Sequence, residues 1–210
     1  MGATRTSRER WIEEGLRVLA ADGPDAVRVE VLAKRLGVTK GGFYGMFTDR
    51  LSLLTAMLDT WERESVDEVL EAVKGEGRGP RERIERAGAL TFSSDRLLPL
   101  DLAVRQWARR DDAVARRLRL VDERRLDLLR ELIASFCGDP VEVEARSLLV
   151  LSASIGRNFL SAGQGGSARP EVAARILDLL LDRTSPVLPP DGRFPSEADP
   201  GEVDRGETGR

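Results

Sequence analysis

Apolar side chains recur at steps of three and four residues through most of this chain of 210 residues. In residues 7–22 they are Trp11, Ile12, Leu16 and Leu19, with charged side chains between them. This spacing puts the apolar positions on one face of an α-helix, whereas a half-buried β-strand needs strict alternation. No segment shows a convincing strand pattern. The sequence therefore predicts an all-α fold.

Residues that stop or start helices divide the N-terminal part into short elements. Gly23 and Pro24 end the first helix, because glycine accepts a left-handed cap and proline cannot continue the helix. The next helix, residues 29–36, is closed by Gly37, and Thr39 offers a hydroxyl cap to the helix after it. A helix, a short turn with glycine and a second helix make the helix-turn-helix plan.

The rest of the chain has the pattern of longer helices. Apolar residues at helical spacing predict one from Asp49 to Val73, which the glycine-rich stretch after it ends. Further helices are predicted within residues 81–94, 97–110, 112–136, 141–163 and 170–184. Residues 186–210 carry six acids and three arginines with few large apolar side chains, so we expect a disordered tail.

Composition removes several kinds of chemistry. The chain has no histidine and one cysteine, Cys137, so His-dependent triads, His-ligated zinc or haem and an internal disulfide are excluded. The lone cysteine favours a cytoplasmic location, and no segment has the apolar length of a signal peptide or membrane span. We predict no catalytic residue, no metal and no cofactor.

The most informative segment is GVTKGGFYGMF, residues 37–47. Its two adjacent glycines leave the backbone bare, as a helix that approaches DNA closely requires. Lys40 can reach a phosphate or a guanine, and the Tyr44 hydroxyl can bond a phosphate oxygen. Phe43 and Phe47, four residues apart, lie on the opposite face and anchor the helix to its own core. The segment therefore predicts a helix with one face for contact and one for packing.

These residues resemble a known family. The run VTKGGFYGMF, followed by DRLSLL, is similar to the recognition helix and the following helix of the TetR family of transcriptional regulators, and the resemblance covers roughly residues 7–60. It implies an N-terminal three-helix helix-turn-helix DNA-binding domain and a C-terminal helical ligand-binding and dimerisation domain. We place these domains at residues 1–50 and 51–185.

The resemblance also assigns the DNA contacts. Residues 29–36 match the first helix of the motif, and about 39–46 match the recognition helix. The expected DNA-binding residues are Arg28, Thr39, Lys40, Gly41, Gly42, Tyr44 and Arg50. Arg28 stands where the family often has Thr or Ser, which loses a helix cap and adds a cation. Met46 stands where a histidine is common, so a DNA contact from that position stays open.

Local charge is compatible with this interpretation. Residues 28–50 carry five cations and two acids, a charge of +3 in a chain whose net charge is −3. A local basic face lets an acidic protein bind DNA, although a solvated surface of mixed charge would have the same composition. The ordered motif favours DNA.

An effector site is expected between helices of the second domain, because binding sites in helical bundles open there and favour aromatic side chains. The candidate ligand-binding residues are Met57, Trp61, Phe92, Trp107, Asn158 and Phe159. Aromatic residues at helical spacing are also ordinary core residues. Arg157 and Asn158 are polar within an apolar helix and need partners, which either a ligand or a neighbouring helix would supply.

The leading hypothesis is a homodimeric, cytoplasmic repressor that an unknown small-molecule effector releases from double-stranded operator DNA, with no membrane association. Its two-fold interface is expected in residues 141–163 and 170–184, with Leu149, Leu177 and Leu180 as candidate contacts. The alternative is an all-α small-molecule-binding protein or enzyme that has lost DNA binding. Specific binding to the DNA upstream of its own gene separates the two.

Overall fold

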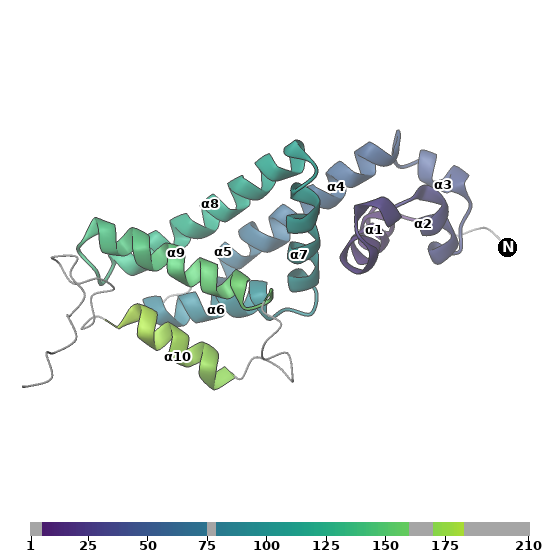
Figure 1. The fold of residues 1–210 in the computed structure, drawn as a ribbon. Helices are drawn as coiled ribbons and strands as arrows, with labels where there is room; N and C mark the ends of the chain where they lie inside the picture. The colour runs from purple at the N-terminus through teal and green to yellow at the C-terminus, as the bar shows by residue number, and fades with distance from the viewer. Residues whose placement is uncertain (1–5, 75–78, 160–169, 183–210) are drawn as a thin grey trace, which may run out of the picture.

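The computed structural model describes residues 6–74, 79–159 and 170–182, and in these ranges it is helical with short turns and no β-strand (Figure 1). The elements in chain order are α1 (Arg8–Asp22), a 3-10 turn η1 (Pro24–Ala26), α2 (Val29–Leu36), α3 (Lys40–Tyr44), α4 (Arg50–Glu62), a π-helical segment η2 (Arg63–Asp67), α5 (Glu68–Val73), α6 (Pro80–Phe92), α7 (Leu97–Ala108), α8 (Asp112–Ala134), α9 (Pro140–Gly156) and α10 (Pro170–Leu181). The predicted all-α fold is confirmed. The expected disordered tail, residues 186–210, lies outside the described residues.

Local chemistry sets the ends of the N-terminal helices. The Ser7 hydroxyl accepts from a backbone N–H of the first turn of α1. Gly23 and Gly37 follow α1 and α2 with φ of 80° and 68°, a region that L side chains rarely adopt. Asp49 and Ser52 form a reciprocal capping box at the start of α4, in which each side chain accepts from the other's backbone N–H.

A first hydrophobic core holds the N-terminal helices together. Trp11 of α1 is fully buried, and its ring meets that of Phe43 edge to face, with centroids 5.4 Å apart. Phe43 in turn stacks on Phe47 at 5.2 Å, so α3 is fixed from one side only. Leu100 and Val104 of α7 belong to the same core, which therefore joins the N-terminal helices to the rest of the molecule.

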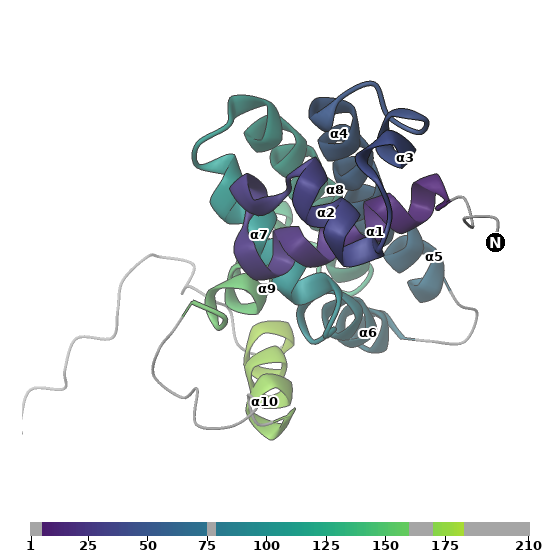
Figure 2. The ribbon, with the colours of Figure 1, turned by 90° about the vertical axis from the view of Figure 1, so that its right-hand side faces the viewer.

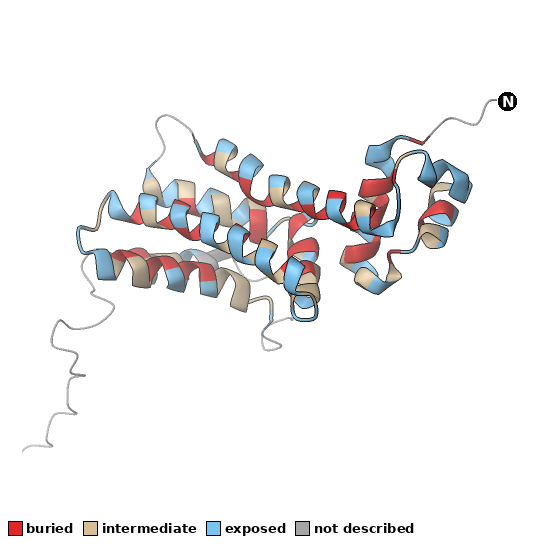
Figure 3. Ribbon diagram, turned by 90° about the horizontal axis from the view of Figure 1, so that it is seen from above, coloured by how far each residue is buried: buried red, intermediate tan, exposed pale blue. Residues whose placement is uncertain are grey.

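The remaining helices form a second, elongated layer of packing. Helix α8 packs on α7 and α9, α6 packs on α5 and α8, and α10 covers α9. Figure 1 shows α1–α3 at one end of the molecule, with α4 leading away from them to the layer of α6, α8, α9 and α10. The end view of Figure 2 places α2 and α3 in front. Buried residues line the inward faces of these helices (Figure 3).

The long helix expected from Asp49 to Val73 is present with one irregularity. Helices α4 and α5 are continuous through η2, where the chain makes a π-helical turn. Such turns are rare in α-helices and often occur at functional sites. The guanidinium of Arg96 bridges Glu64 in η2 and Glu13 in α1 at 2.9 and 2.8 Å, and so ties the irregular turn to the N-terminal helices.

Candidate nucleic-acid interface and interhelical cavity

One side of α3 is bare of packing. Thr39, Lys40, Gly41, Gly42 and Tyr44, which we call the α3 face, are all exposed, and Tyr44 is 63% exposed although its ring touches the buried Phe43. The Thr39 hydroxyl makes no capping bond to α3. Three polar side chains and two glycines are therefore exposed on this side of α3.

The two glycines are not required by packing within the chain. A Cβ added to Gly41 would meet only the Thr39 hydroxyl oxygen, at 3.8 Å, and one added to Gly42 would meet nothing within 4 Å. Neither glycine has a positive φ. Since glycine weakens a helix relative to alanine, the pair has a cost that no contact inside the described structure explains. Close approach by an outside partner does explain it.

The expected phosphate-binding cations already have partners in the protein. The Lys40 ammonium lies 2.7 Å from the Glu30 carboxylate on an exposed surface, and this bond lowers the pKa of Glu30. The Arg28 Nε donates to the carbonyl of Asp25 at 3.0 Å. In both cases a DNA phosphate would have to compete with an acceptor of the protein itself.

Arg50 has a structural contact that the sequence does not reveal. Its side chain reaches back from the start of α4 and donates to the carbonyls of Val27 and Pro24. The Pro24 carbonyl lies in η1 and also accepts from the Val27 N–H, and Val27 lies in the turn before α2. Met46 is half-buried and packs against the first core.

A second candidate site is a cavity of about 770 Å³ lined by residues of η2, α5, α6, α7, α8, α9 and α10. This volume is within the usual range for ligand sites, roughly 300–1,000 Å³. Most of its walls are aliphatic, with Leu128 and Leu129 from α8, Leu151 from α9 and Leu177 and Leu180 from α10. The cavity therefore offers an apolar chamber between helices.

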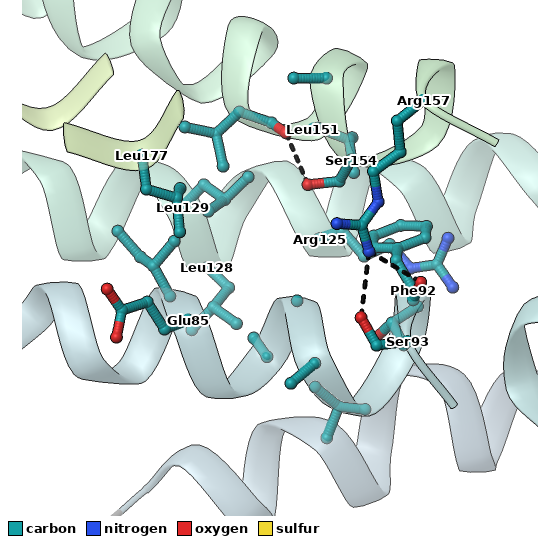
Figure 4. Close-up of a pocket in the computed structure, with 18 of the residues that line it drawn as sticks. Glu85, Phe92, Ser93, Arg125, Leu128, Leu129, Leu151, Ser154, Arg157 and Leu177 are labelled. Atoms are coloured by element: carbon teal, nitrogen blue, oxygen red, sulfur yellow. Dashed lines mark hydrogen bonds between the residues drawn. The ribbon is translucent and has the colours of Figure 1, made fainter. Parts of the chain in front are cut away.

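Polar groups gather at one part of the cavity wall. In Figure 4, Arg125 and Arg157 lie with Phe92 and Ser93 on one side, while Leu128, Leu129 and Leu177 extend to the other. The Arg157 Nη2 donates to the carbonyl of Phe92 at 2.9 Å and to the Ser93 hydroxyl at 3.0 Å. The Arg125 guanidinium lies over the Phe92 ring, 5.3 Å from its centroid.

The candidate ligand residues are divided between the cavity and the rest of the molecule. Phe92 and Asn158 line the cavity. Met57 and Trp61 do not line it, because both face the first core from α4 and are fully buried there, and Trp107 is half-buried against the same core. Phe159 is 54% exposed just after α9 and is also absent from the cavity wall.

The sequence reasoning missed Ser65 and Arg125, both buried polar residues of the cavity wall. A buried arginine on an amphipathic helix looks like a solvated one in the sequence, since α8 carries many charged residues at similar spacing. Arg157 donates a hydrogen bond to the Phe92 carbonyl at the end of α6, so a neighbouring helix is one of its partners. It also lines the cavity, where a ligand could contact it.

Comparison with known proteins identifies the N-terminal helices. The family model of bacterial regulatory proteins of the tetR family matches residues 12–57, which span α1 to the middle of α4. Solved structures of TetR/AcrR-family regulators share the fold of most of the chain. Residues 12–57 are therefore similar to the N-terminal region of the TetR family. The chain has an N-terminal helix-turn-helix DNA-binding domain followed by a helical domain.

Three solved structures illustrate the relationship. FadR from Bacillus subtilis, in complex with stearoyl-CoA, is 16% identical with a TM-score of 0.64, over 84% of this chain and 98% of that one. A TetR/AcrR-family regulator from Thermobifida fusca is 20% identical with a TM-score of 0.62, over 85% and 98%. AibR, in complex with isovaleryl coenzyme A and operator DNA, is 15% identical with a TM-score of 0.63, over 85% and 98%. At these identities the likeness concerns the fold. No curated protein sequence matches the chain significantly.

Two further properties concern the part of the chain that the structure describes. Within it, no helix combines the length and the apolar character needed to cross a bilayer. The same residues contain no group of three or more Cys, Asp and Glu side chains arranged to hold a metal ion.

Proposed function

We propose that this protein is a homodimeric transcriptional repressor of the TetR family that binds operator DNA through the α3 face and is released when a small molecule occupies the cavity. The observation that carries the DNA-binding part is the exposed glycine pair, Gly41 and Gly42, which nothing inside the described structure requires. A helix seated in the major groove needs such a surface.

Two of the similar structures support the two halves of this proposal. AibR was solved with both operator DNA and an acyl-coenzyme A, and FadR with stearoyl-CoA. The cavity of the present chain lies between helices and is lined largely by aliphatic side chains, which suits the proposed role of effector site.

The long helix gives a physical route from effector to DNA. Its first residue follows closely on α3, while Ser65, Val66 and Val69 from its second half line the cavity. Two recognition helices can enter successive major grooves only when they lie about 34 Å apart. A ligand that favours another tilt of the long helix changes this spacing in a dimer and weakens DNA binding without altering the α3 face.

Exposed apolar residues on two packed helices support the dimer. They are Val141, Leu148 and Leu149 of α9 and Val172, Ile176 and Leu179 of α10. Leu177 and Leu180, expected at the interface from the sequence, line the cavity of their own chain instead. Leu149 remains a candidate contact, and the small Ser152 beside it is exposed.

The test of DNA binding starts with selection of fragments from genomic DNA, including the region upstream of the protein's own gene. We expect one sequence class to be enriched. Tyr44→Phe should weaken binding to it by about 1 kcal/mol through loss of a phosphate hydrogen bond. Lys40→Ala should reduce the salt dependence by about one phosphate contact. Lys74→Ala is the matched control, because Lys74 is an exposed lysine paired with Glu71 at the end of α5.

The outcomes separate the hypotheses. If no sequence is enriched, or if Tyr44→Phe and Lys40→Ala bind like Lys74→Ala, the α3 face is not a DNA-binding surface in this protein. The dimer is tested independently by the mass in solution at micromolar concentration. Leu149→Glu should shift that mass to the monomer, whereas a monomeric parent protein would contradict the proposed assembly.

A further inference from the structure

The charge on the cavity wall is unbalanced, and the excess is positive. Three arginines and one glutamate line the cavity. Arg124 pairs with Asp67 at 2.6 Å, and Arg125 is balanced by Asp101 and Asp122 at 2.9 and 3.2 Å. Among the described residues Arg157 has no acidic partner, since its Nη2 donates only to the neutral oxygens of Phe92 and Ser93. Its half-buried guanidinium is therefore a cation of this wall that no described carboxylate offsets.

Two buried polar atoms of the same wall also lack partners. The Arg125 Nε and the Ser65 hydroxyl make no hydrogen bond to any described residue, although Arg125 is 9% exposed and Ser65 is 1% exposed. Buried polar groups are nearly always hydrogen-bonded, so each such exception requires an explanation. An oxygen acceptor inside the cavity would bond the Arg125 N–H and give the Ser65 hydroxyl an acceptor as well.

The two sides of the cavity differ in the group they would accept. On the side of Arg157 and Arg125 the excess charge favours an anion. On the opposite side Leu128 and Leu129 are apolar, and the nearest charge is Glu85, whose carboxylate pairs with Arg81 at 2.8 Å. An anionic group there would meet a carboxylate and no free cation, so the polarity of the wall fixes the direction of a ligand.

We propose that the effector is an amphipathic oxyanion, with its charged head group at Arg157 and the Arg125 Nε and its hydrocarbon part along Leu128, Leu129 and Leu177. This deepens the proposed function and rests on the cavity being its effector site. The head group is a carboxylate or a phosphate ester, because guanidinium groups bind both through charge-assisted hydrogen bonds. An amine would be repelled by the arginines. A neutral head group would leave Arg157 without a counter-ion.

A matched series of ligands tests the class. Binding to the purified full chain is measured by calorimetry for dodecanoate, dodecyl phosphate, dodecanol and dodecylamine, each below the concentration at which it self-associates. The two anions distinguish a carboxylate from a phosphate as the preferred head group. We expect the better anion to bind roughly tenfold more tightly than the alcohol, the gain of one charge-assisted contact. The amine should bind most weakly.

Three variants place the ligand. Arg157→Gln should lower the affinity for the anion to about that for the alcohol. Arg157→Lys should keep part of the preference for the anion over the alcohol. Arg116→Gln, an exposed arginine of α8 outside the cavity wall, is the matched control and should leave the series unchanged. Gly88→Leu should abolish binding of every member, because Gly88 lines the cavity and a Cβ there meets nothing within 4 Å.

The results that would overturn the proposal are equally specific. They are an alcohol that binds as tightly as both anions, an anion preference that survives Arg157→Gln, binding that survives Gly88→Leu, or no binding of any member by the parent protein. DNA binding of each variant without ligand is measured in parallel. Retained DNA binding shows that the variant is folded. A parent protein that does not bind DNA would contradict the proposed function, but it would not contradict the head-group assignment.

Discussion

At the scale of single residues, Gly42 shows how function can be separated from folding. It lies inside the short helix α3, where alanine would be the better helix former, and the space beside its Cα is open. A residue under selection for the fold alone would not need to be glycine there. The open space therefore supports the proposed close approach of DNA at this residue.

The first residue-scale prediction is that Gly42→Ala stabilises the protein and weakens DNA binding. Glycine in a helix interior destabilises a protein by about 0.5–1 kcal/mol relative to alanine. The free energy of unfolding should therefore increase by that amount, which thermal unfolding shows as a higher melting temperature. Binding to the selected DNA should fall, because the new methyl group holds the backbone away. Gly15→Ala is the counterpart in α1: its Cβ would lie 2.6 Å from the Met57 Sδ, so the buried core must shift and stability should decrease. Gly42→Ala with unchanged DNA affinity would argue against close approach at α3.

A second prediction concerns the ion pair on the same surface. Glu30 holds the Lys40 ammonium at 2.7 Å and is itself a negative charge close to the expected position of DNA phosphates. Glu30→Gln should therefore strengthen DNA binding several-fold at low salt, an effect that screening reduces as salt is raised. Glu71→Gln, which removes the partner of the similarly exposed Lys74 just after α5, is the control and should leave DNA binding unchanged. Weaker binding by Glu30→Gln would show that this pair organises Lys40 for DNA and does not compete for it.

At the scale of elements, a buried ionic network joins α7 to α8. Asp101 of α7 is 1% exposed and accepts from both Arg105 and Arg125, and Asp122 of α8 accepts from the same two arginines. Burial opposes the charge on Arg105, but its hydrogen bond to Asp122 and the charge of Asp101 outweigh it and raise its pKa. The two carboxylates therefore stabilise the charge on Arg105.

Breaking this network should be expensive. Asp101→Asn leaves two buried or half-buried guanidinium groups with one carboxylate, and removing one partner from such a pair typically costs about 3–5 kcal/mol. Asp67→Asn is the matched control, since Arg124 is the neighbour of Arg125 on α8 but its pair with Asp67 is about half exposed. That substitution should cost no more than about 1 kcal/mol. The two losses are measured by urea unfolding, and equal losses would mean that the network is not a buried unit.

The sequence predicts the helices well and their contacts poorly. Periodicity and caps such as Ser7 and Asp49 locate the starts of the helices to within a few residues, because these signals are local. The end of α9, Gly156, comes well before the predicted residue 163. The π-helical turn at η2 has no such signal: Arg63–Asp67 contains neither glycine nor proline. Trp61 and Trp107 were expected at the cavity but pack on the first core, because which face of a helix meets which neighbour depends on the packing of the whole chain.

At the scale of the whole molecule, two contacts link the cavity to the DNA-binding helices. One runs from Arg125 in the cavity wall to Asp101 on α7, which packs on α1. The other is Arg96, which bridges Glu64 of η2 and Glu13 of α1. Because η2 also contributes Ser65 to the cavity wall, a ligand that bonds Ser65 acts next to the residue that Arg96 holds. The ion pairs of Arg96 with Glu64 and Glu13 therefore provide a direct contact between the cavity wall and the DNA-binding helices.

The last prediction is that Arg96→Gln reduces the coupling between ligand and DNA more than it reduces the binding of either. Linkage requires that saturating DNA lower the affinity for the ligand by the same factor by which the ligand lowers the affinity for DNA. Such a coupling free energy is typically about 1–3 kcal/mol. The measurement is the affinity for the preferred anion of the dodecyl series with and without saturating DNA, in the parent protein and in Arg96→Gln. In the parent the two affinities should differ, and in the variant they should converge while its affinity for DNA alone stays close to that of the parent. Equal affinities already in the parent would rule out regulation through this cavity, whereas undiminished coupling in Arg96→Gln would leave α7 and its contact with α1 as the route.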